Sequence, residues 1–215
     1  MNTKKTTAFT YLLLVCILIL STSCTNSTTS QDNILIQEWT GPYGGVPAFD
    51  KMEVADIQSA VEYGMEENLK EIETIANNEA VPTFENTIEA MERSGAYLDR
   101  VFSYYGILSS NMSSPEFREV QAVLAPKLSE FSSKINQNEA LFKRIKTVYD
   151  NAQKNPLESD QQRVVELIYK GFAMRGAALD NEKKERYAAI DKELSSFGIS
   201  VYGEKSILIT PKIEK

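Results

Sequence analysis

Apolar and polar residues follow the 3.6-residue period of an α-helix through most of the chain. Over residues 53–76 the apolar positions recur in steps of three and four, while Glu, Lys and Gln fill the positions between them. These apolar positions are Val54, Ile57, Val61, Met65, Leu69, Ile72 and Ile75. The spacing places them along one side, so it predicts an amphipathic helix that ends at Asn77 and Asn78, before Pro82.

The same period predicts two further helices before residue 137. One begins at Thr83, a natural N-cap, and runs through Leu108 past Gly95, where a packed neighbour can come close. The next opens at Pro115 after Ser113 or Ser114, because proline at the first helical position forfeits no hydrogen bond. Pro126 lies inside it and predicts a kink or a split.

Three more helices complete the pattern, from Glu139 to about Gln153, from Ser159, and from Asp180 or Asn181. Asn138 is the expected cap of the first, and Ser159 with Gln162 forms a capping-box pattern in the second. The apolar stripe of the second is Val164, Ile168, Phe172 and Leu179; that of the third is Tyr187, Ile190, Leu194 and Phe197. Residues 53–197 are therefore predicted to form an all-α domain of antiparallel helical hairpins.

The segments on either side of this domain have other patterns. Residues 36–52 contain Trp39–Asp50, in which three Gly and two Pro are interspersed among four large apolar residues. We expect an extended arm that docks its rings onto the helices. Residues 198–215 lack a helical stripe, and the pattern of Ser206–Thr210 predicts a short strand.

The N-terminus has the pattern of a secretory signal peptide over residues 1–23. Lys4 and Lys5 precede an apolar run from Ala8 to Leu20, which is too short for a permanent membrane span. Cys24 follows small residues as in a bacterial lipobox, although Ser21 stands where Leu is usual; the alternative is a chance cysteine beside an ordinary cleavage site. We expect lipidation of Cys24, a Ser/Thr/Asn tether over 24–35, and export to the bacterial cell envelope, anchored in a membrane or periplasmic if not lipidated.

Composition narrows the possible chemistry. The 215 residues contain no histidine, so an H-E-x-x-H zinc centre or a Ser-His-Asp triad cannot be built from them. Cys16 would leave with the signal peptide, and lipidated Cys24 would leave no free thiol. Loss of Lys4 and Lys5 leaves 21 basic side chains against 30 acidic ones, a net charge of −9, which argues against nucleic acid as a partner.

No catalytic or metal-binding residue is predicted. The carboxylate pairs Glu66/Glu67 and Glu71/Glu73 are expected on the solvent face of a helix, with Glu66 paired to Lys70. Tyr104 and Tyr105 are expected in the core rather than in a ligand box. Gly41, Gly44 and Gly45 lack the preceding strand and the following Lys-Ser/Thr of a phosphate loop.

Several strings, in order, resemble a known family. They are Trp39–Asp50, Pro82–Ile88, Ala90–Gly95, Ala125–Leu128, Asn138 with Leu141–Lys146, Val148-Tyr149 and Arg175–Leu179. Over about residues 36–197 the chain resembles the N-terminal helical region of bacterial peptidyl-dipeptidases (dipeptidyl carboxypeptidases) of the thimet oligopeptidase and oligopeptidase A family of zinc metallopeptidases. The resemblance implies a helical wall of a channel that admits short peptides, and a partner in the complementary catalytic portion.

The chain also departs from that family. The family's H-E-x-x-H, its downstream glutamate ligand and its substrate-holding Tyr and His are absent, so no catalytic or zinc residue carries over and zinc is expected only in a full-length relative. We expect a truncated or frameshifted product that is inactive alone, with 198–215 not necessarily of family origin. The alternatives are a stand-alone helical lipoprotein that binds a peptide or protein without catalysis, and a carboxylate-based enzyme.

Overall fold

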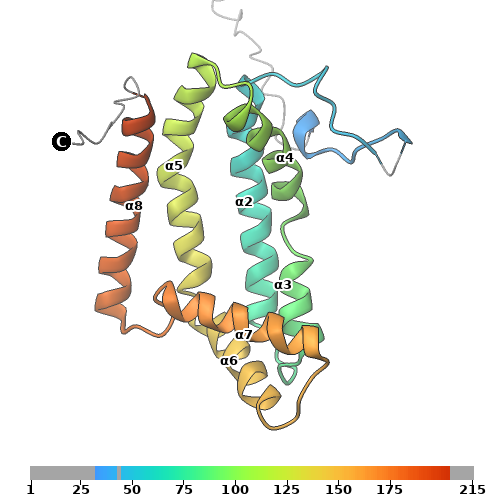
Figure 1. The fold of residues 1–215 in the computed structure, drawn as a ribbon, viewed down its shortest axis with the longest axis vertical. Helices are drawn as coiled ribbons and strands as arrows, with labels where there is room; N and C mark the ends of the chain where they lie inside the picture. Colours follow the sequence, from blue (N-terminus) through green and yellow to red (C-terminus); the bar gives the residue numbers. More distant parts are fainter. Residues whose placement is uncertain (1–31, 43–44, 204–215) are drawn as a thin grey trace, which may run out of the picture.

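Long helices stand side by side, and each upright helix runs opposite to the upright helix before it in the chain (Figure 1). The computed structural model describes residues 32–42 and 45–203, with side chains placed up to residue 194. The upright helices are α2 (Ala55–Ala76), α4 (Ala96–Ser110), α5 (Pro115–Asn136) and α8 (Asn181–Gly203). A pair of helices, α6 (Glu139–Ala152) and α7 (Ser159–Met174), crosses their lower end. The described ranges contain no strand, only an isolated bridge between Thr40 and Val46, so the all-α prediction is confirmed.

The first of two hydrophobic clusters fills the space between α2, α4 and α5. Tyr104 and Phe117 are fully buried in it, and α2 contributes Ile57, Val61 and Met65, as its apolar period predicted, together with Ala60. The Tyr104 hydroxyl accepts a hydrogen bond from the backbone amide of Ala48 at 2.7 Å. Tyr104 is therefore a core residue whose polar end is satisfied, as expected for a buried tyrosine.

The second cluster lies at the lower end, where α6 and α7 meet the end of α2. It includes Ile72 and Ile75 of α2 together with Leu141, Ile145, Val148, Val165 and Phe172. Tyr149 and Tyr169 stack face to face at its edge, with ring centroids 4.2 Å apart. The single stripe of α2 thus serves two clusters, one along each half of its length.

The helix predicted from Thr83 to Leu108 is interrupted. Thr83 is the N-cap, as predicted, of a π-helical turn η4 (Phe84–Glu89) that runs into the short α3 (Ala90–Glu92). Gly95 then adopts a φ of +86°, a left-handed conformation that breaks the helix before α4. α2 and α4 approach each other closely at Gly64, since a Cβ added there would lie 3.0 Å from the Leu98 Cα.

The other helix boundaries test the predicted caps. The side chains of Ser114 and Asn138 accept hydrogen bonds from Phe117 N and Leu141 N, as predicted. α5 continues through Pro126, so this residue does not split the helix. The capping box predicted at Ser159 is wrong, because Glu158 holds the N-cap position and Ser159 is already helical.

The arm packs against the body through backbone and ring contacts. The Phe49 ring meets Tyr104 edge to face at 5.0 Å, which confirms a docked ring. The domain begins before the arm, since Asn33, Leu35 and Ile36 are buried around the 3₁₀ turn η2 (Ile34–Ile36). The last residues of the tether expected over 24–35 are thus core residues. The signal peptide, Cys24 and the strand expected at 206–210 lie outside the described residues.

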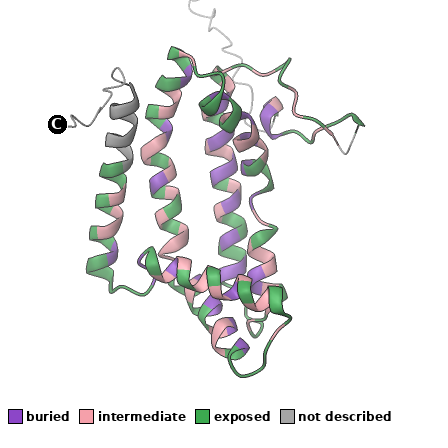
Figure 2. Cartoon of the chain, in the orientation of Figure 1, coloured by how far each residue is buried: buried purple, intermediate pink, exposed green. Residues whose placement is uncertain are grey.

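α8 differs most from its prediction. It continues through Gly203, so the helical pattern does not stop at residue 197. Its expected apolar face is not covered, because Ile190 and Leu194 are 46% and 62% exposed (Figure 2). Phe197 lies beyond the placed side chains. No helix in the described part of the chain is both long and apolar enough to cross a bilayer.

Candidate functional site

The expected carboxylate pairs do not form a reactive centre. The Lys70 ammonium lies 2.9 Å from Glu66 and 2.7 Å from Glu67, on the exposed face of α2 as predicted. Glu71 has a structural role that the sequence did not indicate, since its carboxylate accepts a hydrogen bond from Gly95 N at 2.7 Å. Among residues 32–42 and 45–203, no three His, Cys, Asp or Glu side chains gather closely enough to hold a metal ion.

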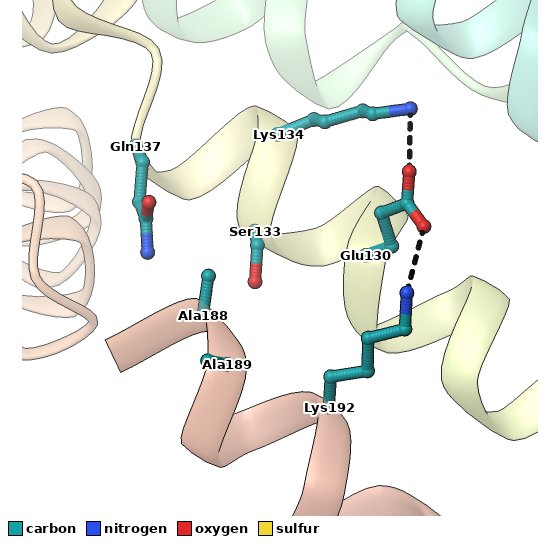
Figure 3. A pocket seen from close by; sticks show the side chains of 7 residues that line it. All are labelled: Glu130, Ser133, Lys134, Gln137, Ala188, Ala189 and Lys192. Carbon is teal, nitrogen blue, oxygen red and sulfur yellow. Dashed lines mark hydrogen bonds and ion pairs between the residues drawn. The ribbon is translucent and has the colours of Figure 1, made fainter. Parts of the chain in front are cut away.

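Where α8 meets α5, the side chains are polar, charged or small rather than large and apolar. An open slot of about 430 Å³ separates the two helices, lined by Glu130, Ser133, Lys134, Gln137, Ala188, Ala189 and Lys192 (Figure 3). Ala188 and Ala189 of α8 are small, which leaves space opposite Ser133 and Gln137. The Gln137 side-chain nitrogen is buried there and has no hydrogen-bond partner in the described part of the chain.

Charged groups border this slot. The Glu130 carboxylate lies 3.1 Å from the ammonium group of Lys134, on its own helix, and 3.4 Å from that of Lys192, on α8. These two ammonium groups lower the pKa of the Glu130 carboxyl. A carboxylate held ionised by two cations is a poor proton donor at neutral pH, so the slot has the character of a contact surface rather than of an acid/base centre.

Further polar contacts hold α8 in place. Ser129 donates a hydrogen bond to the Asp191 carboxylate at 2.7 Å, and the buried Lys184 lies 2.9 Å from Glu139. Asp180 accepts a hydrogen bond from Lys183 N at 3.0 Å, which confirms it as the cap of α8. α8 is therefore fixed to α5 and α6 by hydrogen bonds and ion pairs.

A second hollow lies between the arm and α4. It is lined by Glu38, Trp39, Ala96, Asp99, Arg100 and Ser103. Arg100 donates a hydrogen bond to the Ile36 carbonyl at 3.0 Å and lies 3.6 Å from Glu38, so its charge is used to hold the arm. The Trp39 indole N–H is buried without a hydrogen-bond partner among the residues that the structure describes.

Arg144 of α6 forms a buried clamp on residues 78–87. The residue is 5% exposed, and its guanidinium donates to the carbonyls of Asn78 and Ala80, at 2.5 and 3.0 Å, and to Asn86 Oδ1 at 2.8 Å. Asn86 also closes a reciprocal capping box with Thr83. Burial lowers the pKa of Arg144, and no carboxylate is among its hydrogen-bond acceptors.

The clamp explains why two separate sequence strings belong together. Pro82–Ile88 and Leu141–Lys146 are far apart in the chain but meet at Arg144. Both therefore have a structural role here, holding the turn after α2 against α6. Sequence reasoning missed this contact, because nothing in the pattern of either string indicates its distant partner.

Most of the helical body matches a family of peptidase N-terminal domains. The N-terminal domain family of neurolysin and thimet oligopeptidase matches residues 59–184, so the chain belongs to this family. The matched range runs from α2 into the first turn of α8 and contains the Arg144 clamp.

Individual relatives agree with this assignment. The chain is 31% identical over 161 residues to a dipeptidyl carboxypeptidase of Salmonella typhimurium, covering 75% of this chain and 24% of that protein. It is 30% identical over 168 residues to the Escherichia coli dipeptidyl carboxypeptidase (78% and 24%) and 29% identical over 153 residues to E. coli oligopeptidase A (71% and 22%). The chain therefore spans about a quarter of the length of these relatives.

Proposed function

We propose that this chain is the N-terminal, non-catalytic portion of an exported zinc metallopeptidase that releases dipeptides from the C-termini of short peptides. The observation that carries the proposal is the family match over 59–184, together with relatives named dipeptidyl carboxypeptidase and oligopeptidase A. The partner would be the complementary catalytic portion, and short peptides would bind only when both are present.

The residues of this chain would contribute shape rather than chemistry. None of the 215 residues is a histidine, and Glu130 of the slot and Glu66 of α2 are paired with lysines. Zinc would therefore be held outside this region. The helices would serve as one wall of the peptide channel, held rigid by the two hydrophobic clusters.

An activity assay of the purified chain tests the catalytic part of the proposal. The protein would be incubated with zinc and a blocked tetrapeptide, and released dipeptide would be measured by mass spectrometry, with and without a chelator. We expect no zinc-dependent release. Dipeptide release that the chelator abolishes, from a homogeneous sample, would contradict the proposal.

Export and anchoring form the second part of the proposal. Support comes from Lys4 and Lys5, the apolar run Ala8–Leu20, and Cys24 after small residues. We expect a protein expressed in a bacterium to carry a diacylglycerol on Cys24 and to fractionate with membranes, whereas Cys24→Ala should lack the lipid. An unmodified Cys24 in an N-terminally processed chain would leave export standing and refute the anchor.

The other candidate is a stand-alone helical lipoprotein that binds a peptide or protein. The closed cores favour it, since Tyr104, Phe117 and Ile145 are completely buried within this chain alone. A sharp cooperative thermal transition would support this module, whereas low, broad melting or aggregation would support a portion that needs its partner. The DNA after the codon for Lys215 gives an independent test, because a frame encoding H-E-x-x-H there would favour the peptidase.

A further inference from the structure

α8 presents its apolar residues away from the helix on which it packs. Its contacts with α5 use Asp191, Lys192 and the small Ala188, and Lys184 reaches Glu139 at the start of α6. At 3.6 residues per turn, Ile190 lies about 100–120° around the helix axis from Lys184 and Asp191, and Leu194 lies about 60–80° from them. Ile190 and Leu194 are among the most exposed large apolar residues of the helices.

The packed helices also expose apolar residues, such as Leu167 and Met174 of α7, but each of them buries large apolar side chains as well. Every upright helix other than α8 contributes large apolar side chains to a hydrophobic cluster, as do α6 and α7. No described side chain of α8 belongs to either cluster. A long helix with an apolar stripe normally buries that stripe against a neighbour, so the outward Ile190 and Leu194 indicate an absent neighbour.

The polar contacts with α5 and α6 fix where the stripe points. Three separate links, Ser129–Asp191, Glu130–Lys192 and Glu139–Lys184, fasten α8 over about two turns of its length. At the start of the helix, Tyr187 lies over Gly176, whose φ of +92° shapes the preceding turn. The stripe is thus held outward by specific bonds and is preorganised for a partner.

The size of the stripe indicates which partner it fits. Ile190 and Leu194 together offer on the order of 200 Å² of exposed surface, well below the roughly 800 Å² per partner of a stable interface between separate proteins. A second copy of this chain would gain too little from it. A region of the same polypeptide needs no such area, because covalent linkage supplies a high effective concentration.

We propose that Ile190 and Leu194 are the surface on α8 that docks the polypeptide region lying C-terminal to this one in full-length family members. This inference rests on the proposed function, and the relatives, about four times the length matched here, supply such a region. The occupant should present an apolar patch to α8. Docking would fix α8, and with it α5, relative to the catalytic portion.

The test places the same substitutions in two contexts. The double variant Ile190→Glu/Leu194→Glu is made in the 215-residue chain and in a chimera, in which this chain's residues 36–197 replace the matching segment of the Salmonella dipeptidyl carboxypeptidase. Ile190→Leu/Leu194→Met, which keeps both side chains apolar, is the matched control. Readouts are thermal midpoint, hydrogen exchange of residues 187–194, and dipeptide release.

The proposal expects a context-dependent effect. In the chain alone the glutamates should shift the midpoint by no more than about 2 °C, since exposed positions tolerate substitution. In the chimera they should reduce dipeptide release about tenfold or more and remove the protection of 187–194, because a misplaced wall misaligns the substrate. The control should leave both proteins unchanged.

Each contrary outcome has a distinct meaning. An active chimera that tolerates the glutamates refutes the docking surface and leaves the proposed function standing. An inactive chimera whose residues 187–194 are protected, with protection lost in the glutamate variant, refutes the proposed function alone. A chimera that does not fold, or a chain alone that dimerises until the glutamates are introduced, overturns the docking proposal.

Discussion

α4 and α8 each pack along a long neighbouring helix, but they do so with opposite kinds of side chain. α4 lies on α2 through Leu98, Val101, Tyr104 and Leu108, each at most 7% exposed. α8 lies on α5 through alanines, hydrogen bonds and ion pairs, with its leucine and isoleucine in solvent. The comparison teaches that helix contact alone does not measure how firmly a helix is held, because apolar burial dominates stability.

The largest expected effect lies on the α4 side of this comparison. Tyr104→Ala should lower the free energy of unfolding by about 3–5 kcal/mol, because a fully buried ring is lost and a cavity remains. Urea unfolding followed by circular dichroism measures it. Tyr104→Phe, which loses only the bond from Ala48, should cost about 1 kcal/mol. A loss as small as that of Leu194→Ala, within about 0.5 kcal/mol, would abolish the contrast between the helices.

Arg144→Met tests whether a polar contact is decisive where it is buried. The change leaves the carbonyls of Asn78 and Ala80 without their donor, and we expect a loss of about 2–3 kcal/mol, since relief of the buried charge offsets part of the cost. Hydrogen exchange should rise in residues 78–87 first. Arg144→Lys retains the charge without the planar donor fork and should be only a partial rescue. Full stability of Arg144→Met would show that the clamp is dispensable.

A smaller effect is expected where polar bonds hold α8. Asp191→Ala removes the bond from Ser129 and should lower the free energy of α8 opening by about 1 kcal/mol, with little change in the global thermal midpoint. Faster amide exchange in α8, at unchanged rates in α4, is the measurement. Because the two groups share one bond, Ser129→Ala/Asp191→Ala should cost no more than the larger single change. Additive losses would contradict this pairing.

The smallest expected effect is the pH dependence of the contact between α8 and α5 at Glu130. Lys134 and then Lys192 lower the pKa of Glu130 below its ordinary value of 4.5. The stabilisation is therefore fully present above pH 4.5 and is lost as the pH falls through the lower folded-state value. We expect α8 exchange to accelerate in this acid range while α4 stays protected, and Glu130→Gln to remove part of that pH dependence. Because Glu130 is exposed, salt should weaken the effect.

The helical body was predictable because its signals are local. The stripe of α2 and the caps Thr83, Ser114 and Asn138 act within a few residues of one another, so the sequence alone reveals them. The break at Gly95 was missed because its left-handed φ depends on the turn around it and on Glu71, which is 24 positions away. The helical period extends across the break unchanged.

The candidate surface was less predictable than the fold. Period identified Ile190 and Leu194 as one stripe but assigned it to the interior of this domain, since a stripe does not say which neighbour covers it. The contacts of α8 with α5 and α6 arise from Asp191 and Lys184, whose partners Ser129 and Glu139 are 62 and 45 positions away. Nothing in the sequence of either helix indicates which residues form such pairs.

The Arg144 clamp also has a consequence for the order of folding. Its hydrogen bonds join residues 57 to 66 positions apart, so the turn after α2 is complete only once α6 has formed. In a chain delivered N-terminal end first, from a ribosome or through a translocation pore, the carbonyls of residues 78–87 bond to water instead of Arg144 until residue 144 emerges. Closure of this loop is then a late event, at which the lower hydrophobic cluster can assemble.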